Sequence, residues 1–385
     1  MTRLATELRV FDQIADIQPD AWNRLAGTHP ALQHAFLQAL EQSGSVDVQA
    51  GWQPCHLTLW RDGQLVGAMP LYRKSHSWGE YVFDWAWARA YEQHGLDYYP
   101  KLISAVPFSP LPGARLLAEN DEDRRALIEA AIGVTRELGD SSLHILFPTP
   151  TEAQFAGECG MQLREQIQFH WQRDPAWHSF DDFLASLNHD KRKKIKQERR
   201  KALHGPDGEI DVVRKHGTAI TARDWAFFER CYANTYLEHN SQPYLNLAFF
   251  KQLHAAMPDA CLLIIASRNG QPLAAAFDLV GPDALYGRYW GAQWDDAGFA
   301  PGLHFELCYY QGLEFALEHG LDTFEGGAQG EHKMARGFMP VTTWSAHWLA
   351  DPRFANAVGR FLANERQAVD EWAEALAAQH PFRRT

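Results

Sequence analysis

One pattern occurs twice in this 385-residue chain and limits the possible folds more than any other feature. Residues 55–73 read CHLTLWRDGQLVGAMPLYR, and residues 261–280 read CLLIIASRNGQPLAAAFDLV. Each is an apolar run, an Arg-x-Gly-Gln centre and a second apolar run. Asp-Gly and Asn-Gly favour tight hairpin turns because both residues tolerate positive φ. Asp62 and Asn269 lie 207 residues apart, about half the chain, so the shared context predicts a duplicated fold.

The segments after the two hairpins also correspond. After the first hairpin come 79–88 (GEYVFDWAWA), which we interpret as a strand, a helix-like segment at 121–139 and a strand-like segment at 141–148. After the second come a strand-like segment at 284–293, a helix-like segment at 303–320 and a strand-like segment at 321–327. This order predicts an α+β fold in which mixed sheets are covered by helices. We expect an N-terminal domain over 1–165 and a C-terminal domain over 166–385. The latter would include a basic helix at 189–203 and a terminal helical segment at 351–380.

Composition excludes several classes of protein. Apolar residues make up 46% of the chain and charged residues 22%, which is typical of a globular protein. No window of eighteen apolar residues and no N-terminal apolar core occur, so we expect a cytoplasmic protein without a membrane span. Five scattered cysteines and the absence of HExxH or a tight Cys/His array predict no metal site. The patterns GxSxG, GxGxxG and GxxxxGK[ST] are missing as well.

Positive charge is concentrated in NHDKRKKIKQERRK (188–201), although the chain has a formal net charge of −12. Eight of the eleven residues from Lys191 to Lys201 are basic. Like charges one helical turn apart destabilise a helix by roughly 0.2–0.5 kcal/mol per pair, and Glu198 relieves only part of this through Lys194 and Lys201. One interpretation is a solvated helix face, and the other is a surface that binds a polyanion. The residues expected to bind it are Lys191, Arg192, Lys193, Lys194, Lys196, Arg199 and Arg200.

Three stretches carry a resemblance to a known family: 98–117 (YYPKLISAVPFSPLPGARLL), 189–201 (HDKRKKIKQERRK) and 289–338, from YWGAQ to EHKMARGF. They resemble the FemAB-like proteins of the wider GNAT (N-acyltransferase) superfamily, in a bacterial group described only as acetyltransferases or peptidoglycan-related proteins. The resemblance implies a tandem GNAT-type fold and transfer of an acyl or aminoacyl group to an amine. It also implies a polyanionic partner, which would be tRNA, a nucleotide-linked precursor or CoA. No tightly bound cofactor and no stable protein partner are expected.

Two departures bear on the donor. Where acetyl-CoA enzymes have a glycine loop that holds the pyrophosphate, this chain reads DDAGFAPGLHFE (295–306), which begins with two acids and contains no lysine or arginine. Fem-type transferases lack that loop and use aminoacyl-tRNA, and HKMARGF (332–338) is similar to their Phe-Lys-x-x-Phe-Gly-like signature. Lys333 matches the signature lysine, while His332 replaces the aromatic residue before it. Aminoacyl-tRNA and acyl-CoA both stay open as donors.

The glycine-rich segment FEGGAQGEHKMARGF (324–338) is the expected catalytic region. Amide formation requires a base that removes a proton from the amine and a group that stabilises the oxyanion. We expect Lys333 to stabilise the oxyanion and Glu331, His332 or Glu325 to act as the base. Further substrate-binding candidates are Gln329, Gly330 and Arg336 here, Arg288, Tyr289 and Trp290 in the second half, and Lys101 and Arg115 in the first. The alternative interpretation of 324–338 is an ordinary glycine-rich turn with solvated charges. The alternative for the tyrosine and tryptophan is that they pack in the core.

The sequence therefore predicts an amide-forming acyl- or aminoacyltransferase. An ordinary acyl-CoA-dependent N-acetyltransferase, a nucleic-acid-binding module that uses the basic helix, and a degenerate acyltransferase that serves as a scaffold are the alternatives.

Overall fold

The structure is a computed structural model, and it describes residues 6–205, 208–238, 240–293, 300–328, 330–377 and 381–383. The chain forms two compact units. Unit 1 comprises Met1–Ile167 and Thr342–Trp372, and unit 2 comprises Gln168–Val341 and Ala373–Thr385. Strands β9 (Gln162–Gln172) and β16 (Met339–Leu349) each run from one unit into the other.

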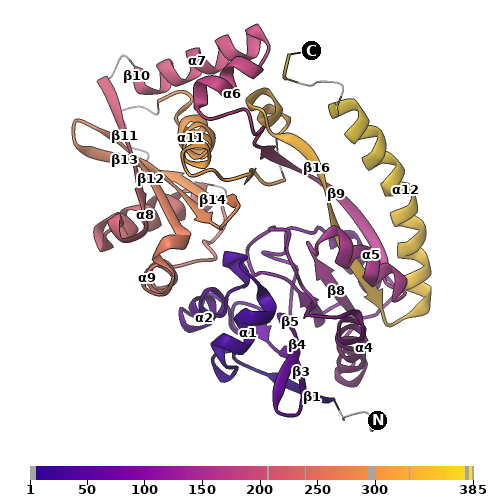
Figure 1. Ribbon diagram of the computed structural model, residues 1–385. Coiled ribbons are helices and arrows are strands. Elements are labelled where there is room, and N and C mark those ends of the chain that lie inside the picture. Colours follow the sequence, from indigo (N-terminus) through magenta and orange to yellow (C-terminus); the bar gives the residue numbers. More distant parts are fainter. Residues whose placement is uncertain are drawn as a thin grey trace. The chain divides into compact units, whose positions relative to one another are not determined.

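Unit 1 contains two groups of hydrogen-bonded strands (Figure 1). The first has the order β1-β3-β4-β7, with β1 (Glu7–Phe11), β3 (His56–Arg61), β4 (Gln64–Met69) and β7 (Leu117–Ala118). In the second, β2 (Trp52–Pro54), β5 (Leu71–Lys74), β6 (Lys101–Ser104) and β8 (Ser142–Leu146) are neighbours in that order, and the end of β16 pairs with β8. Strands β6 and β8 are parallel.

The helices of unit 1 are α1 (Pro19–Ala26), α2 (His34–Gln42), α3 (Trp85–Gln93), α4 (Asp121–Leu138), α5 (Pro150–Glu158) and most of α12 (Pro352–Ala377), with short 3-10 turns η1 (Ile14–Asp16) and η2 (Pro30–Leu32). Helix α4 confirms the predicted helix. The Asn120 side chain accepts a hydrogen bond from the Asp123 backbone N–H at its start, and Gly139 ends it in the left-handed conformation. Its buried residues Leu127 and Ile128 belong to the core that the strands form.

Residues 79–88 do not form the predicted strand, because Trp85 begins helix α3. The alternating tryptophans suggested a strand, but the residues that become buried are Trp87 and Tyr91, four positions apart, as on one face of a helix. The Tyr91 ring lies 3.9 Å from that of Phe354 on α12, between ring centroids. This packing also explains why most of the terminal segment 351–380, which the sequence analysis placed with the second half, is part of unit 1.

The two predicted hairpins are present and agree in detail. Strands β3 and β4 enclose Asp62-Gly63, and β12 (Cys261–Arg268) and β13 (Gln271–Val280) enclose Asn269-Gly270. All four turn residues have positive φ, between 51° and 73°. Each hairpin has one shift of register, between Leu59 and Trp60 in the first and between Ala266 and Ser267 in the second. These bulges are separated by the same 207 residues as the turns, which supports the duplication.

Unit 2 is built on one strand series (Figure 1). Its order is β10 (His204–Gly205), β11 (Gly208–His216), β12, β13, β14 (Ala284–Ala292) and β15 (Thr323–Glu325), followed by the second half of β9. The pairs from β10 to β14 are antiparallel, β14 and β15 are parallel, and β15 and β9 are antiparallel. The predicted strands over 284–293 and 321–327 are confirmed as β14 and β15.

The helices of unit 2 are α6 (Phe180–Ser186), α7 (His189–Leu203), α8 (Ala222–Glu238), α9 (Leu247–Ala256), α10 (Leu303–Phe305), the π-helical turn η5 (Glu306–Tyr310) and α11 (Gln311–Glu318), with 3-10 turns η3 (Gly217–Ala219), η4 (Pro258–Ala260) and η6 (Glu331–Arg336). On one face of the sheet, Trp225 of α8 and Phe250 of α9 contact Phe277 of β13. On the other face, Gly312 of α11 lies against Leu285 and Phe324, so closely that a Cβ would lie 2.5 Å from the Phe324 ring.

The predicted helix over 303–320 is confirmed with one irregularity, because α10, η5 and α11 follow each other without a break. π-helical turns inside α-helices frequently occur at functional sites. Helices α6 and α7 are close in the chain but separate. Helix α6 ends at Ser186, and the Asn188 side chain accepts a hydrogen bond from the Lys191 backbone N–H, which starts α7. Helix α7 has the bounds 189–203 that the sequence predicts.

No helix in the described parts of the chain combines the length and the apolar character that crossing a bilayer requires.

Candidate functional site

The parallel ladder between β14 and β15 is short. It consists of Ala284↔Thr323, Leu285↔Phe324 and Tyr286↔Glu325. Strand β15 then ends, while β14 continues to Ala292. Along this continuation Thr235 and Asn234 of α8 donate hydrogen bonds to the carbonyls of Trp290 and Ala292, at 3.1 and 3.2 Å. The two strands therefore part at Tyr286 and Glu325, and the glycine-rich segment begins at that point.

The place where β14 leaves β15 coincides with a β-bulge. Phe277 pairs with Tyr289 and Asp278 with Gly287, so Arg288 is the extra residue. The Arg288 guanidinium donates to the Tyr289 hydroxyl at 3.0 Å and lies over the Tyr289 ring. Burial raises the pKa of Asp278 well above its ordinary value, although the Arg288 backbone N–H and guanidinium oppose this shift. Sequence reasoning missed Asp278, since its only signal is an acid in an apolar strand.

Lys333 lies in the 3-10 turn η6, which is bounded by Gly330 and Gly337 with φ of 101° and 86°. Such backbone angles favour glycine, so the glycine-rich pattern sets the path of this turn. The Lys333 side chain is buried, and its Nζ donates to the Gly326 carbonyl at 2.5 Å. No carboxylate among the described side chains forms an ion pair with it. Burial lowers the pKa of Lys333 to about 8, and no described carboxylate offsets this effect.

His332 is the base candidate whose geometry the structure defines best. Its ring lies 5.4 Å from the Phe305 ring and 6.2 Å from the Tyr309 ring, between centroids. Burial, helped by Arg336 and Lys333, lowers the pKa of His332, which favours the neutral imidazole near pH 7. Glu325 is the last residue of β15 and pairs with His170 of β9. The side chain of Glu331 and the whole of Gln329 lie outside the described residues.

Arg336 connects the glycine-rich turn to the basic helix. Its guanidinium donates to the His332 carbonyl at 2.7 Å and to the Glu198 carboxylate of α7 at 2.8 Å, and it lies 3.6 Å from the centroid of the Phe305 ring. Arg336 is buried, and its guanidinium is held by these groups. Glu198 also accepts a hydrogen bond from Tyr310 at 2.5 Å. The sequence suggested that Glu198 pairs with Lys194. In the structure Glu198 lies 4.0 Å from Lys194 and closer to Arg336 and Tyr310.

The basic helix α7 has one inward cation and an exposed basic face. Arg199 donates to Glu306, which is fully buried, at 2.7 Å and to Glu314 at 2.5 Å. Arg199 is thus held by carboxylates within unit 2, and it differs in this from the other predicted polyanion-binding residues. The other predicted residues are half-exposed or exposed: Lys191, Arg192, Lys193, Lys194, Lys196 and Arg200. Among the described residues, the only one of these six that lies within ion-pair distance of an acid is Lys194, which is 4.0 Å from Glu198.

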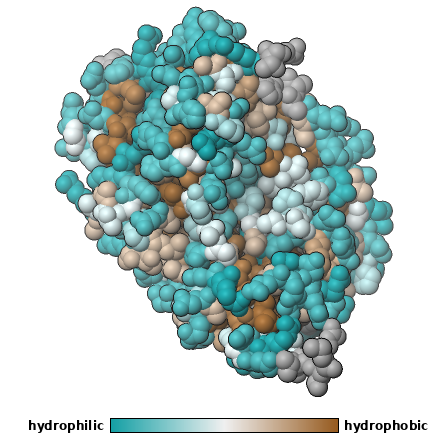
Figure 2. All heavy atoms as spheres, in the orientation of Figure 1, coloured by the Kyte–Doolittle hydropathy of each residue, from teal (hydrophilic) through white to brown (hydrophobic). Residues whose placement is uncertain are grey.

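A surface hollow of about 350 Å³ follows this face and is lined by His189, Arg192, Lys193, Lys196, Gln197 and Arg200. A second hollow of about 640 Å³ shares Lys196 and extends to Phe180 of α6 and Glu314 of α11. The top of the view in Figure 2, where Figure 1 places α7, is coloured hydrophilic. We refer to Arg192, Lys193, Lys196 and Arg200 as the basic face of α7.

The other predicted binding residues fall in different surroundings. Trp290 lies on β14 beyond its last pair with β15, and its ring is 5.1 Å from that of His304. Lys101 and Arg115 belong to unit 1 and are fully buried. The Arg115 guanidinium donates to the carbonyls of Leu146, Ala114 and Leu111, so it fixes the path of its own loop and exposes no atom to a substrate.

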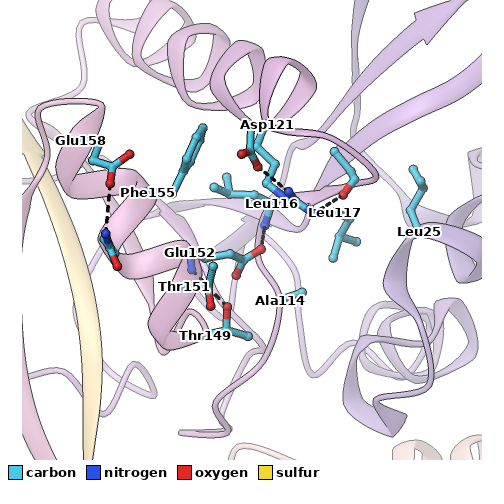
Figure 3. A pocket seen from close by; sticks show the side chains of 13 residues that line it. Leu25, Ala114, Leu116, Leu117, Asp121, Thr149, Thr151, Glu152, Phe155 and Glu158 are labelled. Atoms are coloured by element: carbon cyan, nitrogen blue, oxygen red, sulfur yellow. Dashed lines mark hydrogen bonds and ion pairs between the residues drawn. The ribbon is translucent and has the colours of Figure 1, made fainter.

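Unit 1 has a hollow of about 420 Å³ that the sequence did not predict (Figure 3). It lies where α4 and α5 begin, beside Leu117 of β7. The Glu152 carboxylate accepts hydrogen bonds from the backbone N–H groups of Arg115 and Leu116, at 2.8 and 2.9 Å. The signal in the sequence is Thr149-x-x-Glu152, a capping box at the start of α5. Because Glu152 already satisfies these N–H groups, we assign it a structural role.

The expected donor loop is only partly described. Residues 294–299, which include Asp295 and Asp296, lie outside the described residues. Gly302 has a φ of 89° and immediately precedes α10. In the described parts of the chain, no group of three His, Cys, Asp or Glu side chains is placed to hold a metal ion.

Two repeats of a bulged hairpin, a helix and a parallel strand pair define the tandem GNAT-type α+β fold that the sequence predicts. The chain belongs to the FemAB-like family, described as peptidoglycan biosynthesis/recognition, whose model matches residues 13–384. No curated protein sequence matches the chain significantly.

Solved structures share this fold at low sequence identity. FemX is 11% identical, with 89% of this chain and 98% of FemX covered and a TM-score of 0.54. The C-terminal DUF2156 domain of an Agrobacterium fabrum protein, provisionally assigned as a lysylphosphatidylglycerol synthetase, is 8% identical over 90% of this chain and 95% of that domain, with a TM-score of 0.52. A conserved protein of unknown function from Bacteroides thetaiotaomicron VPI-5482 is 11% identical over 88% of this chain and 99% of that one, with a TM-score of 0.50.

Proposed function

We propose that this protein transfers an acyl or aminoacyl group from a polyanionic donor to an amine and thereby forms an amide bond. The observation that carries the proposal is Lys333, a buried ammonium that contacts a backbone carbonyl and no described carboxylate. A cation accelerates acyl transfer when it meets negative charge that develops in the transition state. Lys333 has this capacity because no described acid neutralises it in advance.

In the proposed reaction the amine nitrogen attacks the donor carbonyl and forms the new C–N bond. Negative charge develops on the carbonyl oxygen, where Lys333 stabilises it. His332, neutral near pH 7, accepts the proton that the nitrogen loses, with Glu325 and Glu331 as the other candidates. The tetrahedral centre then collapses, the bond from carbon to the donor oxygen or sulfur breaks, and the leaving group takes up a proton.

We propose the basic face of α7 as the surface that binds the donor. Residues three or four positions apart on a helix are about 5–6 Å apart, so the face presents a row of cations rather than one cluster. Such a row fits successive phosphates of a nucleic acid better than a single pyrophosphate, which favours aminoacyl-tRNA over acyl-CoA. Arg336 and Glu198 join the helix to the turn that contains Lys333.

A donor and acceptor screen tests this function. The protein is incubated with aminoacyl-tRNA, acetyl-CoA or a longer acyl-CoA and with a panel of amines, and amide products are detected by mass spectrometry. Thermal shift reports donor binding separately, and we expect weak or no stabilisation by acetyl-CoA. Stabilisation by RNA without any product would favour the nucleic-acid-binding alternative.

Lys333→Met tests the role of the lysine once a product is found. We expect turnover to fall by about 10²–10³, with donor binding within a few-fold. The matched control is Lys251→Met, at an exposed lysine of α9, which should leave turnover unchanged. Equal turnover in Lys333→Met and the parent would assign the oxyanion to Arg336 or to a backbone N–H.

A further inference from the structure

Unit 1 contains two buried lysines that face each other. Lys74 of β5 and Lys101 of β6 are direct partners in the antiparallel register, so their side chains lie on the same face. Both are 0% exposed. Two like charges in this arrangement destabilise a sheet, and burying an ammonium adds a large desolvation cost. This pair therefore requires anions nearby.

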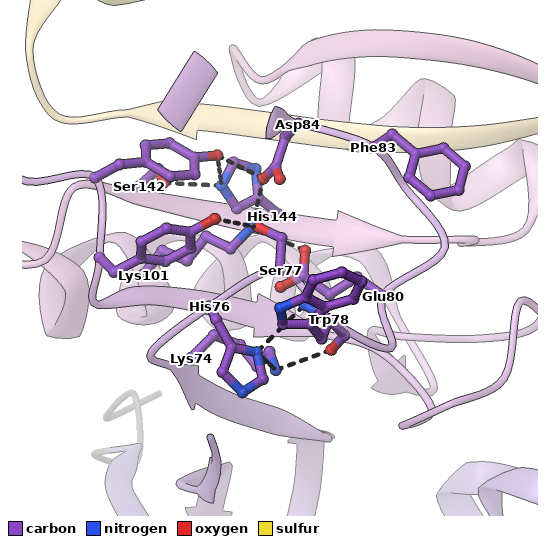
Figure 4. Close-up of polar contacts among 12 residues, drawn as sticks. Lys74, His76, Ser77, Trp78, Glu80, Phe83, Asp84, Lys101, Ser142 and His144 are labelled. Atoms are coloured by element: carbon purple, nitrogen blue, oxygen red, sulfur yellow. Dashed lines mark hydrogen bonds and ion pairs between the residues drawn. The ribbon is translucent and has the colours of Figure 1, made fainter. Parts of the chain in front are cut away.

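The anions come from the segment that directly follows β5, residues 75–84 (Figure 4). Lys101 Nζ donates to the carboxylates of Glu80, at 2.8 Å, and Asp84, and to the Ser77 hydroxyl at 2.9 Å. Burial disfavours the charged form of Lys101, but Asp84 and Glu80 outweigh this effect, and the pKa of Lys101 is raised. Lys101 thus receives both carboxylates.

Lys74 receives neither of them. Its Nζ lies 3.3 Å from the Trp78 carbonyl and 3.5 Å from His76 Nδ1, and 3.9 Å from the centroid of the Trp52 ring. Burial lowers the pKa of Lys74 to about 7. Among the described residues no carboxylate is within ion-pair distance of Lys74. The two facing lysines are therefore compensated unequally.

The carboxylates do not fit their surroundings fully either. Glu80 Oε1 and Asp84 Oδ1 are buried and have no hydrogen-bond partner among the described residues, and the same holds for Ser104 Oγ of β6 and Trp52 Nε1 of β2. Buried polar atoms in folded proteins are nearly always paired, and an unpaired one costs about 1–3 kcal/mol. A cluster that served only to stabilise the fold would leave fewer of these atoms without partners.

The covering segment is held mainly through these polar contacts. Gly79 and Tyr81 are both left-handed, with φ of 80° and 60°. The side chains of Trp78 and Phe83 are 57% and 59% exposed, and Phe83 points away from the cluster in Figure 4. Only Val82 of the segment is a buried apolar residue. Little apolar burial would thus be lost if the segment moved away from the lysines.

We propose that Lys74 and Lys101 form an anion-binding site in unit 1, that Glu80 occupies it in this structure, and that a phosphate or carboxylate group of a small molecule displaces Glu80. Withdrawal of Glu80 leaves Asp84 as the one described carboxylate in contact with the lysine pair, and an anion that enters favours the charged form of Lys74. Glu80 contacts Lys101 but not Lys74. An incoming oxyanion would contact both lysines, and the Trp52 side chain would lie beside it. This site belongs to unit 1 and is independent of the reaction proposed for unit 2.

Hydrogen exchange of the unaltered protein gives the first test. The probes are inorganic phosphate and acetate, compared with chloride at equal ionic strength, and exchange is followed by mass spectrometry. A ligand usually slows exchange, but an anion that displaces Glu80 should speed up exchange in 75–84 and leave α5 unchanged. An effect of phosphate alone or of acetate alone identifies the anionic group. Unchanged or slower exchange in 75–84 with both anions overturns the proposal.

Substitutions give the second test, by calorimetric titration with the same two anions. Glu80→Gln keeps the shape but removes the competing charge, so we expect at least about tenfold tighter anion binding. Adding Lys74→Met to Glu80→Gln should abolish the gain. The matched control is Glu92→Gln, at an exposed acid of α3. Equal affinity in Glu80→Gln and the parent, or an equal gain in the control, overturns the proposal, and the exchange experiment decides if Glu80→Gln does not fold.

Discussion

The two parallel strand pairs of this molecule begin alike and end differently. Strands β6 and β8 share three residue pairs, and so do β14 and β15. After its last pair β6 stops, and unit 1 continues through the loop 105–116, in which Val106, Phe108 and Leu111 are buried and Arg115 donates to backbone carbonyls. Strand β14 instead continues to Ala292, while the chain after β15 becomes the glycine-rich turn.

Two of the buried lysines, Lys101 and Lys333, also differ. Lys101 in unit 1 contacts two carboxylates, and its pKa is raised. Lys333 in unit 2 contacts one carbonyl, and its pKa is lowered to about 8. Described acids thus neutralise Lys101, whereas no described acid forms an ion pair with Lys333, or with the second buried lysine of unit 1, Lys74. The acyl transfer that we propose uses Lys333 of unit 2, although the two hairpins are nearly equivalent.

The largest expected effect concerns stability. Lys101→Met should reduce the free energy of unfolding by about 3–5 kcal/mol, because the carboxylates of Glu80 and Asp84 remain buried without the cation that pairs with them. Lys333→Met leaves no described carboxylate without a partner, so we expect a loss of about 1 kcal/mol or less. Chemical denaturation of both variants measures this difference. Similar losses in both would contradict the contrast between the two lysines.

The next effect is a pH dependence of turnover. Lys333 must be protonated to stabilise an oxyanion, so turnover should fall about tenfold per pH unit above pH 8. Lys333→Arg stays charged and should lose this alkaline limb. The pKa of Lys333 is lower in the folded than in the unfolded state, so the folded protein should also gain stability as pH rises from about 8 towards 10.5. An alkaline limb that persists in Lys333→Arg would assign it to another group.

The basic face of α7 predicts a change in salt dependence. Replacing Lys193, Lys196 and Arg200 by Gln should weaken RNA binding and flatten its log–log salt slope by roughly 0.7 per lost phosphate contact. A control pair, Arg223→Gln with Lys251→Gln, removes exposed charge from α8 and α9. Titration at several salt concentrations separates the two sets. A slope that changes equally in both would show that only net charge matters, and an unchanged slope would return α7 to a solvated face.

The smallest effects test how equivalent the two hairpins are. Asp62→Asn and Asn269→Asp exchange the turn residues, and each should change the free energy of unfolding by less than about 0.5 kcal/mol. Asp62→Ala and Asn269→Ala should each cost about 1 kcal/mol, because alanine disfavours the φ of 53° or 51° found there. Thermal unfolding of the four variants measures this. Unequal costs of the two alanine variants would indicate that one turn depends on its surroundings.

The sequence predicted most local structure for reasons that lie within short segments. Asp-Gly and Asn-Gly set two tight turns, and the glycines around Lys333 allow its turn. Residues 79–88 were predicted wrongly because the burial of Trp87 and Tyr91 depends on α12, more than 260 residues later in the chain. Local alternation cannot report a partner at that distance.

The candidate site was predicted in part. The position of the lysine and glycines in 324–338 follows from the sequence, and the roles proposed for them stay predictions. The contacts of these residues could not be predicted from the sequence. Glu198 and Arg336, for example, are 138 residues apart in the chain and meet only when the chain folds. Arg199 and Arg200 are adjacent and chemically identical, yet one contacts Glu306 and the other faces outward.

The sequence by itself determined the duplication, the hairpin turns, the bounds of α7 and the placement of basic residues along it, because each depends on backbone preferences or on residue spacing. The tertiary structure decided which charges are neutralised. Ion pairs depend on distance and burial, and both are set by segments that are far apart in the chain. Only folding therefore distinguishes Lys101, with two carboxylates, from Lys333, with none among the described side chains.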